Sequence, residues 1–312
     1  MAISKITNPH DRFFKKTFKD IRVVKSFVQN YFPCDIIDIL DINSLESADE
    51  SFITDELKEY FSDIVLRARL KHGGDFYISL LFEHKSEMYE YVSLQLLRYM
   101  QGSWDELKSK KDLLPVFIPS LIYHGKQRWK VSKSLSALFD KESTEKLEKY
   151  FPNYEYLLFD LSHMTESEIK GEIKLKAFIE VVKGIFFEYD EEKIVKLLML
   201  LDDLEKKEKA IDYVETVLRY LFDVRKDITP EKLIQIDKKH NLEKGEIIMT
   251  VAEQLRKEGY QLGMKEGMKE GMKEGERKKA LDTAKNMLKL NINIETIEQV
   301  TGLSREEIEK VK

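Results

Sequence analysis

A predicted β-hairpin constrains the fold of this chain more than any other feature. Residues 63–70 read DIVLRARL, residues 71–75 read KHGGD, and a more apolar run continues to Lys85. Alternate residues of the first segment are apolar, as in a strand with one buried face. A Gly-Gly pair between two such segments indicates a tight turn. We therefore expect two antiparallel strands joined by this turn.

The segments around the hairpin differ in character. Residues 8–33 and 87–107 show the spacing of amphipathic helices. Residues 113–125 are rich in β-forming residues and contain proline and glycine, which predicts a further core strand. From about Glu166 onward the pattern is almost entirely helical. This order predicts a mixed α/β (α+β) fold with a helical C-terminal half.

Three parts of the chain follow from these changes in pattern. We expect a core at residues 1–160, a helical subdomain at 161–245, and a glycine-punctuated helix with a helical pair at 246–312. The length allows this division, because 312 residues are enough for one large domain or two modest ones.

A four-residue repeat marks the C-terminal part. Residues 263–274 read GMKE three times, with Gly259 and Gly275 on the same spacing. Each glycine lowers helix propensity by about 1 kcal/mol, and pairing between Lys and Glu offsets part of this loss. Small residues at this spacing also let helices approach closely. The repeat therefore predicts a semi-flexible or self-associating helix, with a solvated spacer as the alternative.

A pair of short helices is expected after the repeat. Gly302 should end the first helix, Ser304 should cap the second, and Glu307 occupies the capping-box position. Such a pair can form a helix-turn-helix that reads DNA. We favour packing or oligomerisation, because the second helix is acidic.

Composition restricts the partners and the compartment. The net charge of -5 gives no overall attraction to nucleic acid, so such contacts must come from local patches. The single cysteine, Cys34, excludes an internal disulfide and is expected to be packed rather than reactive. No apolar run approaches the ~18 residues of a membrane span, and the first residues lack the apolar region of a signal peptide. We expect a cytoplasmic protein with no membrane partner.

Three charged residues are predicted to converge at one end of the hairpin. If the turn is centred on Gly73, Asp63 lies opposite Glu83, and opposed residues of an antiparallel pair share a face. Lys85 shares that face, because it is two residues from Glu83 along the strand. Two adjacent carboxylates repel each other, so we expect a divalent cation between them, Mg²⁺ or alternatively Mn²⁺ or Ca²⁺. This arrangement predicts a metal-dependent phosphodiesterase.

An ordinary ion pair is the alternative interpretation of this cluster. The Glu-x-Lys spacing also occurs at Glu56/Lys58, Glu106/Lys108, Glu168/Lys170, Glu172/Lys174 and Glu205/Lys207. Unlike these five pairs, Glu83/Lys85 ends an apolar strand and has an aspartate predicted opposite it. A cross-strand pair at the edge of the sheet would satisfy the same pattern without a catalytic role.

Five segments together resemble a known family. They are PHDRFFKKTF (9–18), Asp63, FEHKS (82–86), SLQLLRYM (93–100) and LPVFIPSLIYHGKQRW (114–129). These segments are similar to the Rpn family of recombination-promoting nucleases, also described as "PD-(D/E)XK nuclease family putative transposase". The resemblance implies a restriction-endonuclease-like core, a mixed sheet flanked by helices, and divalent-metal-dependent cleavage of DNA phosphodiesters.

The resemblance assigns roles to residues of the hairpin. Asp63 and Glu83 match the two acids of the family motif, and Lys85 matches its lysine. The backbone carbonyl of His84 is implied as a further metal ligand. Ser62 precedes Asp63 where the name of the motif has proline, at a position that varies in such enzymes.

Four further residues match family features on helices. Gln95 and Tyr99 match a Gln-x-x-x-Tyr feature and share one helical face, where they can form hydrogen bonds at the site or to the DNA backbone. Packing of Tyr99 and solvation of Gln95 are the alternative. His10 and Asp11 lie where the superfamily often places another acid, although we favour a helix-capping role for Asp11.

Basic residues after the 113–125 strand are the predicted DNA contacts. Lys126, Arg128 and Lys130 lie close together in sequence, with Trp129 among them. Phosphate contacts need only such a local patch, whatever the net charge. A solvated rim is the alternative for each residue taken singly.

The predicted function is that of a metal-dependent DNA endonuclease of the Rpn-like class, with recombination as the implied process. A homo-oligomer formed through the C-terminal helices is expected. The alternative is a catalytically inactive DNA-binding or oligomeric scaffold protein with the same fold, and RNA remains open as the substrate. A strand-transfer transposase is disfavoured, because no third carboxylate is evident in the predicted cluster.

Overall fold

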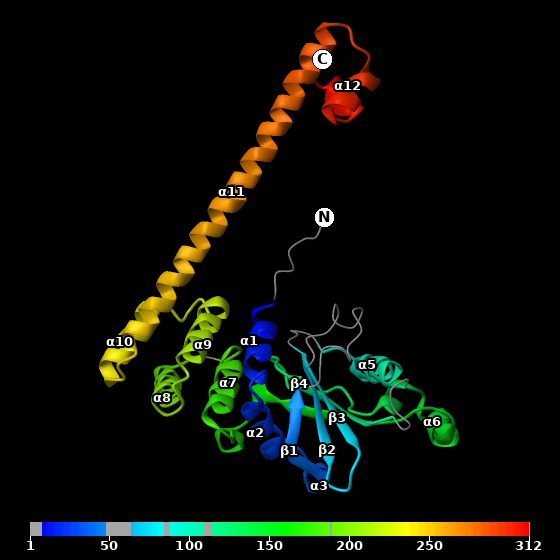
Figure 1. The fold of residues 1–312 in the computed structure, drawn as a ribbon, viewed down its shortest axis with the longest axis vertical. Coiled ribbons are helices and arrows are strands. Elements are labelled where there is room, and N and C mark those ends of the chain that lie inside the picture. Colours follow the sequence, from blue (N-terminus) through cyan, green and yellow to red (C-terminus); the bar gives the residue numbers. More distant parts are fainter. Residues whose placement is uncertain (1–7, 48–63, 84–87, 109–113, 188, 312) are drawn as a thin grey trace. The chain divides into compact units, whose positions relative to one another are not determined.

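The chain forms two compact units, Met1–Met249 and Thr250–Lys312. The computed structural model describes residues 8–47, 64–83, 88–108, 114–187 and 189–311 (Figure 1). The α-helices that begin in the first unit are α1 (Pro9–Phe18), α2 (Ile21–Tyr31), α3 (Cys34–Ile39), α5 (Val92–Leu107), α6 (Lys141–Leu147), α7 (Ile173–Gly184), α8 (Glu191–Glu208), α9 (Ile211–Val224), α10 (Pro230–His240) and α11 (Gly245–Lys289). In the described part of the chain, no helix has the length and apolar character that a membrane crossing requires.

A five-stranded mixed sheet lies at the centre of the first unit (Figure 1). Its strands, in spatial order, are β1 (Leu40–Ser47), β2 (Ile64–Leu70), β3 (Asp75–Glu83), β4 (Val116–Tyr123) and β5 (Leu157–Asp160). β1, β2 and β3 are antiparallel neighbours, whereas β3, β4 and β5 run parallel. The predicted mixed α/β fold is confirmed, as are strands within 63–85 and 113–125. β1 and β5 were not expected from the sequence.

Helices cover both faces of the sheet (Figure 1). On one face, Leu96 of α5 and Leu121 of β4 belong to one apolar cluster. On the other face, the ring of Phe27 in α2 lies 4.9 Å from the ring of Phe159 in β5. Phe159 pairs with Ile122 and therefore shares its face of the sheet. Leu121 is the residue before Ile122 and points to the opposite face, because side chains alternate along a strand. Both faces of the sheet thus carry apolar residues.

The hairpin between β2 and β3 contains the predicted turn but corrects its register. Ile64 pairs with Leu80, so the pairing is offset by two residues from the one predicted. Gly73 and Gly74, with φ of 95° and 98°, both lie in the second half of the turn, which is therefore centred before Gly73. A two-residue offset leaves the alternation of faces between the two strands unchanged.

The helical segment predicted at 8–33 is divided into α1 and α2. Asp20 separates them and caps α2, where its carboxylate accepts the Arg22 N–H at 3.0 Å. The predicted capping role of Asp11 is wrong, because Asn8 caps α1 and accepts the His10 N–H at 3.1 Å. Asp11 is the third residue of α1, three positions after the cap, so it lies inside the first turn.

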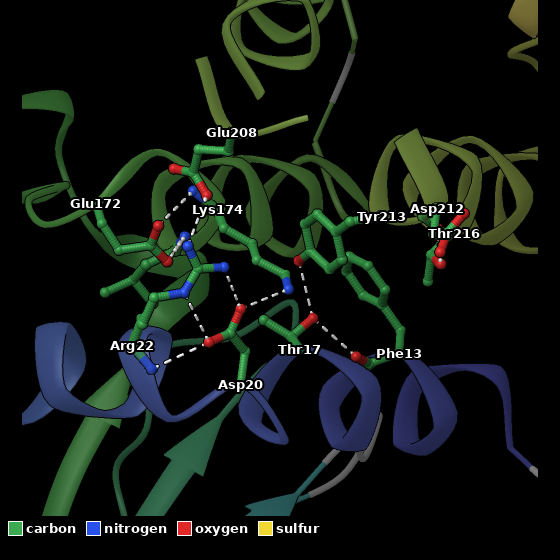
Figure 2. A network of polar contacts seen from close by, with 11 residues as sticks. Phe13, Thr17, Asp20, Arg22, Glu172, Lys174, Glu208, Asp212, Tyr213 and Thr216 are labelled. Atoms are coloured by element: carbon green, nitrogen blue, oxygen red, sulfur yellow. Dashed lines mark hydrogen bonds and ion pairs between the residues drawn. The ribbon is translucent and has the colours of Figure 1, made fainter. Parts of the chain in front are cut away.

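A charged network joins α1 and α2 to α7 and α9 (Figure 2). Lys174 of α7 donates to Asp20 at 2.9 Å and lies 4.5 Å from the ring centroid of Tyr213 in α9. Arg22 donates to the same carboxylate at 2.8 Å. Burial alone would raise the pKa of Asp20, but the hydrogen bonds from Arg22 and Lys174 outweigh it and hold that pKa well below its ordinary value.

The second unit contains most of α11 together with α12 (Ile294–Thr301) and α13 (Arg305–Glu309). Its apolar core includes Ala284, Ile297, Leu303 and Ile308. Gly302 ends α12 with a φ of 70°, and Ser304 and Glu307 form the capping box of α13, as predicted. The GMKE repeat at 263–274 is helical, and its residues are exposed.

Cys34 is not packed as the sequence analysis predicted. It is exposed at the first position of α3. None of the six residues of α3 is buried, so this short helix offers no interior position for the thiol. The prediction failed because the apolar residues next to Cys34 in sequence do not create a buried face.

Candidate active site at the carboxyl edge of the sheet

Three parallel strands end side by side at one edge of the sheet. Glu83 at the end of β3 pairs with Tyr123 at the end of β4, and Tyr123 pairs with Asp160 at the end of β5. Open α/β sheets bind ligands at the carboxyl ends of their parallel strands, where the following loops converge. This edge is therefore the candidate active site.

The loop after β4 is held closely against this edge. His124 is fully buried, and its ring lies 4.7 Å from the ring of Phe186. The Gly125 N–H donates to Ser162 Oγ at 3.1 Å. A Cβ at Gly125 would lie 2.0 Å from the Tyr123 hydroxyl oxygen, so the close approach of these two residues requires glycine.

Asp160 ties the same loop to β5. Its carboxylate accepts the Trp129 N–H at 3.2 Å and lies 2.9 Å from His163 Nδ1. The Trp129 side chain donates from Nε1 to the Tyr156 hydroxyl at 3.0 Å. Burial raises the pKa of Tyr156 to about 12, so its hydroxyl stays protonated. The basic segment of the loop is therefore attached to the sheet at Trp129.

The N-terminal helix brings His10 to the loop that follows β4. The His10 ring lies 5.8 Å from the ring of His124, and its Nδ1 lies 2.6 Å from the Tyr220 hydroxyl of α9. The neighbouring Asp11 forms an ion pair with Lys15 at 3.2 Å. Its Oδ1 is buried without a hydrogen-bond partner in the part of the chain that the structure describes. Two motifs far apart in sequence, at 9–11 and 123–125, thus meet.

The predicted metal and catalytic residues of the hairpin are described only in part. Glu83 is the last residue of β3. Asp63, His84 and Lys85 lie outside the described residues, so the convergence of Asp63, Glu83 and Lys85 stays a prediction. Among the residues that are described, no three His, Cys, Asp or Glu side chains gather to form a metal site.

Gln95 and Tyr99 both lie on α5, one helical turn apart. Tyr99 is 2% exposed and packs in a cluster with Tyr77 and Phe117. Gln95 is half-buried. Tyr99 thus has the packing that the alternative interpretation described, and its predicted role in DNA binding stays a prediction.

The predicted DNA contacts lie on the surface of the loop after β4. Lys126, Arg128 and Lys130 are all exposed, while Trp129 between them is half-buried. None of the three basic side chains has an ion pair within 4.0 Å among the described residues. Their charges are therefore available for an anionic partner, as phosphate contacts require.

A groove of about 360 Å³ lies between α1 and α9, next to His10. The groove is lined by charged residues of both signs: the basic residues Arg12, Lys16 and Arg219 and the acidic residues Asp212 and Glu215. Tyr220 also lines the groove. Sequence reasoning did not single out Tyr220, because it occupies an ordinary apolar position of a helix and lies 210 residues from His10.

Comparison with known proteins identifies the family. The model of the family described as "Putative transposase, YhgA-like" matches residues 8–212. Recombination-promoting nuclease RpnA of Escherichia coli (strain K12) is 26% identical over 309 residues, which cover 99% of this chain and 98% of that protein. RpnC of the same strain, also named a recombination-promoting nuclease, is 24% identical over 200 residues, covering 64% of this chain and 63% of that protein.

A third relative carries a different description. RpnE of Escherichia coli (strain K12), named an inactive recombination-promoting nuclease-like protein, is 26% identical over 268 residues, covering 85% of this chain and 87% of that protein. No solved structure matches the chain. The family match spans the sheet, the loop after β4 and the N-terminal helix. This chain belongs to the family described as "Putative transposase, YhgA-like", and its relatives include proteins named recombination-promoting nucleases.

Proposed function

We propose that this protein is a divalent-metal-dependent DNA endonuclease with a restriction-endonuclease-like core. The observation that carries the proposal is the position of Glu83 at the edge where β3, β4 and β5 end together. Membership of a family with relatives named nucleases supports the same activity. Recombination is the process that those names suggest.

The donor set proposed for the metal consists of oxygen atoms. Asp63, Glu83 and the backbone carbonyl of His84 would hold the ion, and hard oxygen ligands are those that Mg²⁺, Mn²⁺ and Ca²⁺ prefer. A bound ion of this kind lowers the pKa of its water and neutralises charge on the phosphate. Lys85 would orient the attacking water or the phosphate as a point charge.

The DNA backbone is proposed to contact the loop after β4. Lys126, Arg128 and Lys130 are exposed on the loop that leaves the carboxyl edge. This position places positive charge on the same connection that carries His124 at the candidate site. Gln95 and Tyr99 of α5 are proposed to support the site or the bound strand.

Self-association is proposed for the C-terminal helices. Met264, Met268 and Met272 of α11 are 51%, 67% and 67% exposed, at one apolar residue per GMKE repeat. Exposed apolar side chains at regular helical spacing are suited to packing against another helix. A second copy of the same helix offers a matching row.

A catalytically inactive protein with the same fold is the second candidate. The observation that favours it is the name of RpnE, which is described as inactive and resembles this chain as closely in percentage identity as RpnA does. Such a protein would bind DNA or assemble without cleaving it.

A cleavage assay with supercoiled plasmid separates the two candidates. The nuclease proposal predicts nicked or linear product with Mg²⁺, no product with EDTA, and recovery when excess Mg²⁺ is restored. An RNA of similar length, tested under the same conditions, decides between DNA and RNA as substrate. Intact plasmid with both Mg²⁺ and Mn²⁺ would favour the inactive candidate.

A further inference from the structure

Tyr220 lies beyond the family match but contacts a residue next to the candidate active site. It lies on α9, beyond residues 8–212, yet its hydroxyl is 2.6 Å from Nδ1 of His10. Its ring stacks on Phe13 with centroids 4.2 Å apart, which fixes it against α1. Tyr220 is 3% exposed, so water competes little for its hydroxyl.

The hydrogen bond decides which nitrogen of His10 carries the proton. Burial raises the pKa of Tyr220 well above its ordinary value, so the hydroxyl keeps its proton. His10 is its one hydrogen-bond partner among the described residues, and a buried O–H without an acceptor would cost about 1–3 kcal/mol. Tyr220 therefore donates to Nδ1, and the neutral His10 ring carries its proton on Nε2.

His10 lies beside the edge where the parallel strands end. Its ring is 5.8 Å from the ring of His124, the residue directly after β4. β4 ends at Tyr123, which pairs with Glu83 of β3. A hydrogen-bond donor that is fixed before binding stabilises charge developing on a phosphate without reorganising.

We propose that Tyr220 is a positioning residue of the candidate active site, which holds the His10 ring so that Nε2–H donates to a phosphate oxygen of the nucleic acid. The inference rests on the proposed nuclease function. It adds α9 to the site and makes His10 one of the residues that contact the substrate. Tyr220 acts through His10 and does not touch the phosphate.

Tyr213 provides a matched control on the same helix. Tyr213 is also 3% exposed, its ring lies 6.2 Å from that of Phe13, and its hydroxyl lies 2.8 Å from Thr17 Oγ1. Tyr220→Phe and Tyr213→Phe each remove one buried hydroxyl between α1 and α9. Their melting temperatures should fall by similar amounts, but only Tyr220→Phe releases the His10 ring.

Steady-state cleavage of a DNA duplex with Mg²⁺ tests the proposal. Tyr220→Phe should lower kcat about tenfold with KM within about twofold, because the lost interaction strengthens in the transition state. Tyr213→Phe should keep kcat within about twofold of the wild type. In a His10→Ala background, Tyr220→Phe should change kcat by less than about twofold, because the two residues act as one unit.

The outcomes separate the inference from the function on which it rests. A wild-type kcat for Tyr220→Phe, or a loss no larger than that of Tyr213→Phe, would overturn the positioning role and leave the nuclease intact. A tenfold loss in the His10→Ala background would overturn it as well. Failure of the wild-type protein to cleave DNA would overturn the proposed function and the inference together.

Discussion

Lys174 Nζ lies 2.9 Å from Asp20 Oδ2, although 154 residues separate the two in sequence. The contact ties α7 to the junction of α1 and α2, and both side chains are largely buried, at 12% and 16% exposed. Lys174→Met should lower the free energy of unfolding by about 1–3 kcal/mol, because the buried carboxylate loses a charged donor. Urea denaturation followed by circular dichroism measures the loss.

A surface ion pair serves as the control for Lys174→Met. Lys146 and Glu142 are 2.6 Å apart but 70% and 77% exposed, so Lys146→Met should change the free energy by less than about 1 kcal/mol. Equal effects of the two substitutions would contradict the importance of the buried network.

The network around Asp20 should make the fold less stable as the pH falls. The hydrogen bonds hold the pKa of Asp20 below its ordinary value of 3.8, so the carboxylate stabilises the fold above that pH and loses its contribution as the pH falls further. Asp20→Asn retains a capping side chain and removes the charge. The difference in melting temperature between wild type and Asp20→Asn should therefore shrink between about pH 4 and pH 2.

Protonation of Glu172 changes stability in the opposite sense to protonation of Asp20. The pH range of the stability change therefore shows which of the two carboxylates causes it. Burial raises its pKa above the ordinary 4.5, so protonation of Glu172 stabilises the fold as the pH falls through that raised value. This change occurs above the Asp20 window. A constant difference between wild type and Asp20→Asn from pH 6 to pH 2 would show that Asp20 does not carry the sensitivity.

Lys126, Arg128 and Lys130 should control the salt dependence of DNA binding. Each phosphate contact contributes about 0.9 to the slope of log K against log salt, so replacing all three by alanine should reduce the slope by about 2–3. Fluorescence anisotropy with a labelled duplex from 50 to 300 mM NaCl measures it. Replacing Lys141, Lys146 and Lys149 of the α6 region removes the same charge and should leave the slope unchanged, since these exposed residues lie outside the site.

The methionines of the GMKE repeat should control self-association. Replacing Met264, Met268 and Met272 by glutamine removes apolar side chains that a second copy would bury, which should weaken association at least about tenfold. Sedimentation equilibrium measures the change in mass. The control replaces Lys265, Lys269 and Lys273 by glutamine. Identical masses for both variants and the wild type would favour the solvated spacer.

Local features of the fold could be predicted from the sequence. Gly302, Ser304 and Glu307 act within one helical turn, so residue types alone identify the caps of α12 and α13. The cap of α1 carried a signal of the same kind, because Asn8 precedes Pro9 at the first helical position.

Other features depend on contacts that residue types do not reveal. Two consecutive glycines indicate a turn, but Gly73 and Gly74 do not reveal its centre, and the predicted register was therefore wrong by two residues. β1 is polar and β5 has four residues, so neither shows a clear strand pattern. The approach of Tyr220 to His10 spans 210 residues and follows from helix packing alone.

The central claim is that the active site lies at the edge of the sheet where β3 ends. Glu83 is the predicted metal ligand at that edge, where it pairs with Tyr123 of β4. The most direct measurement is the rate of Mg²⁺-dependent plasmid nicking by Glu83→Ala, compared with Glu90→Ala at an exposed glutamate seven residues on. We expect Glu83→Ala to lose at least about a hundredfold in rate with an unchanged melting temperature, and Glu90→Ala to match the wild type. A wild-type nicking rate for Glu83→Ala would contradict the assignment of the active site to this edge of the sheet.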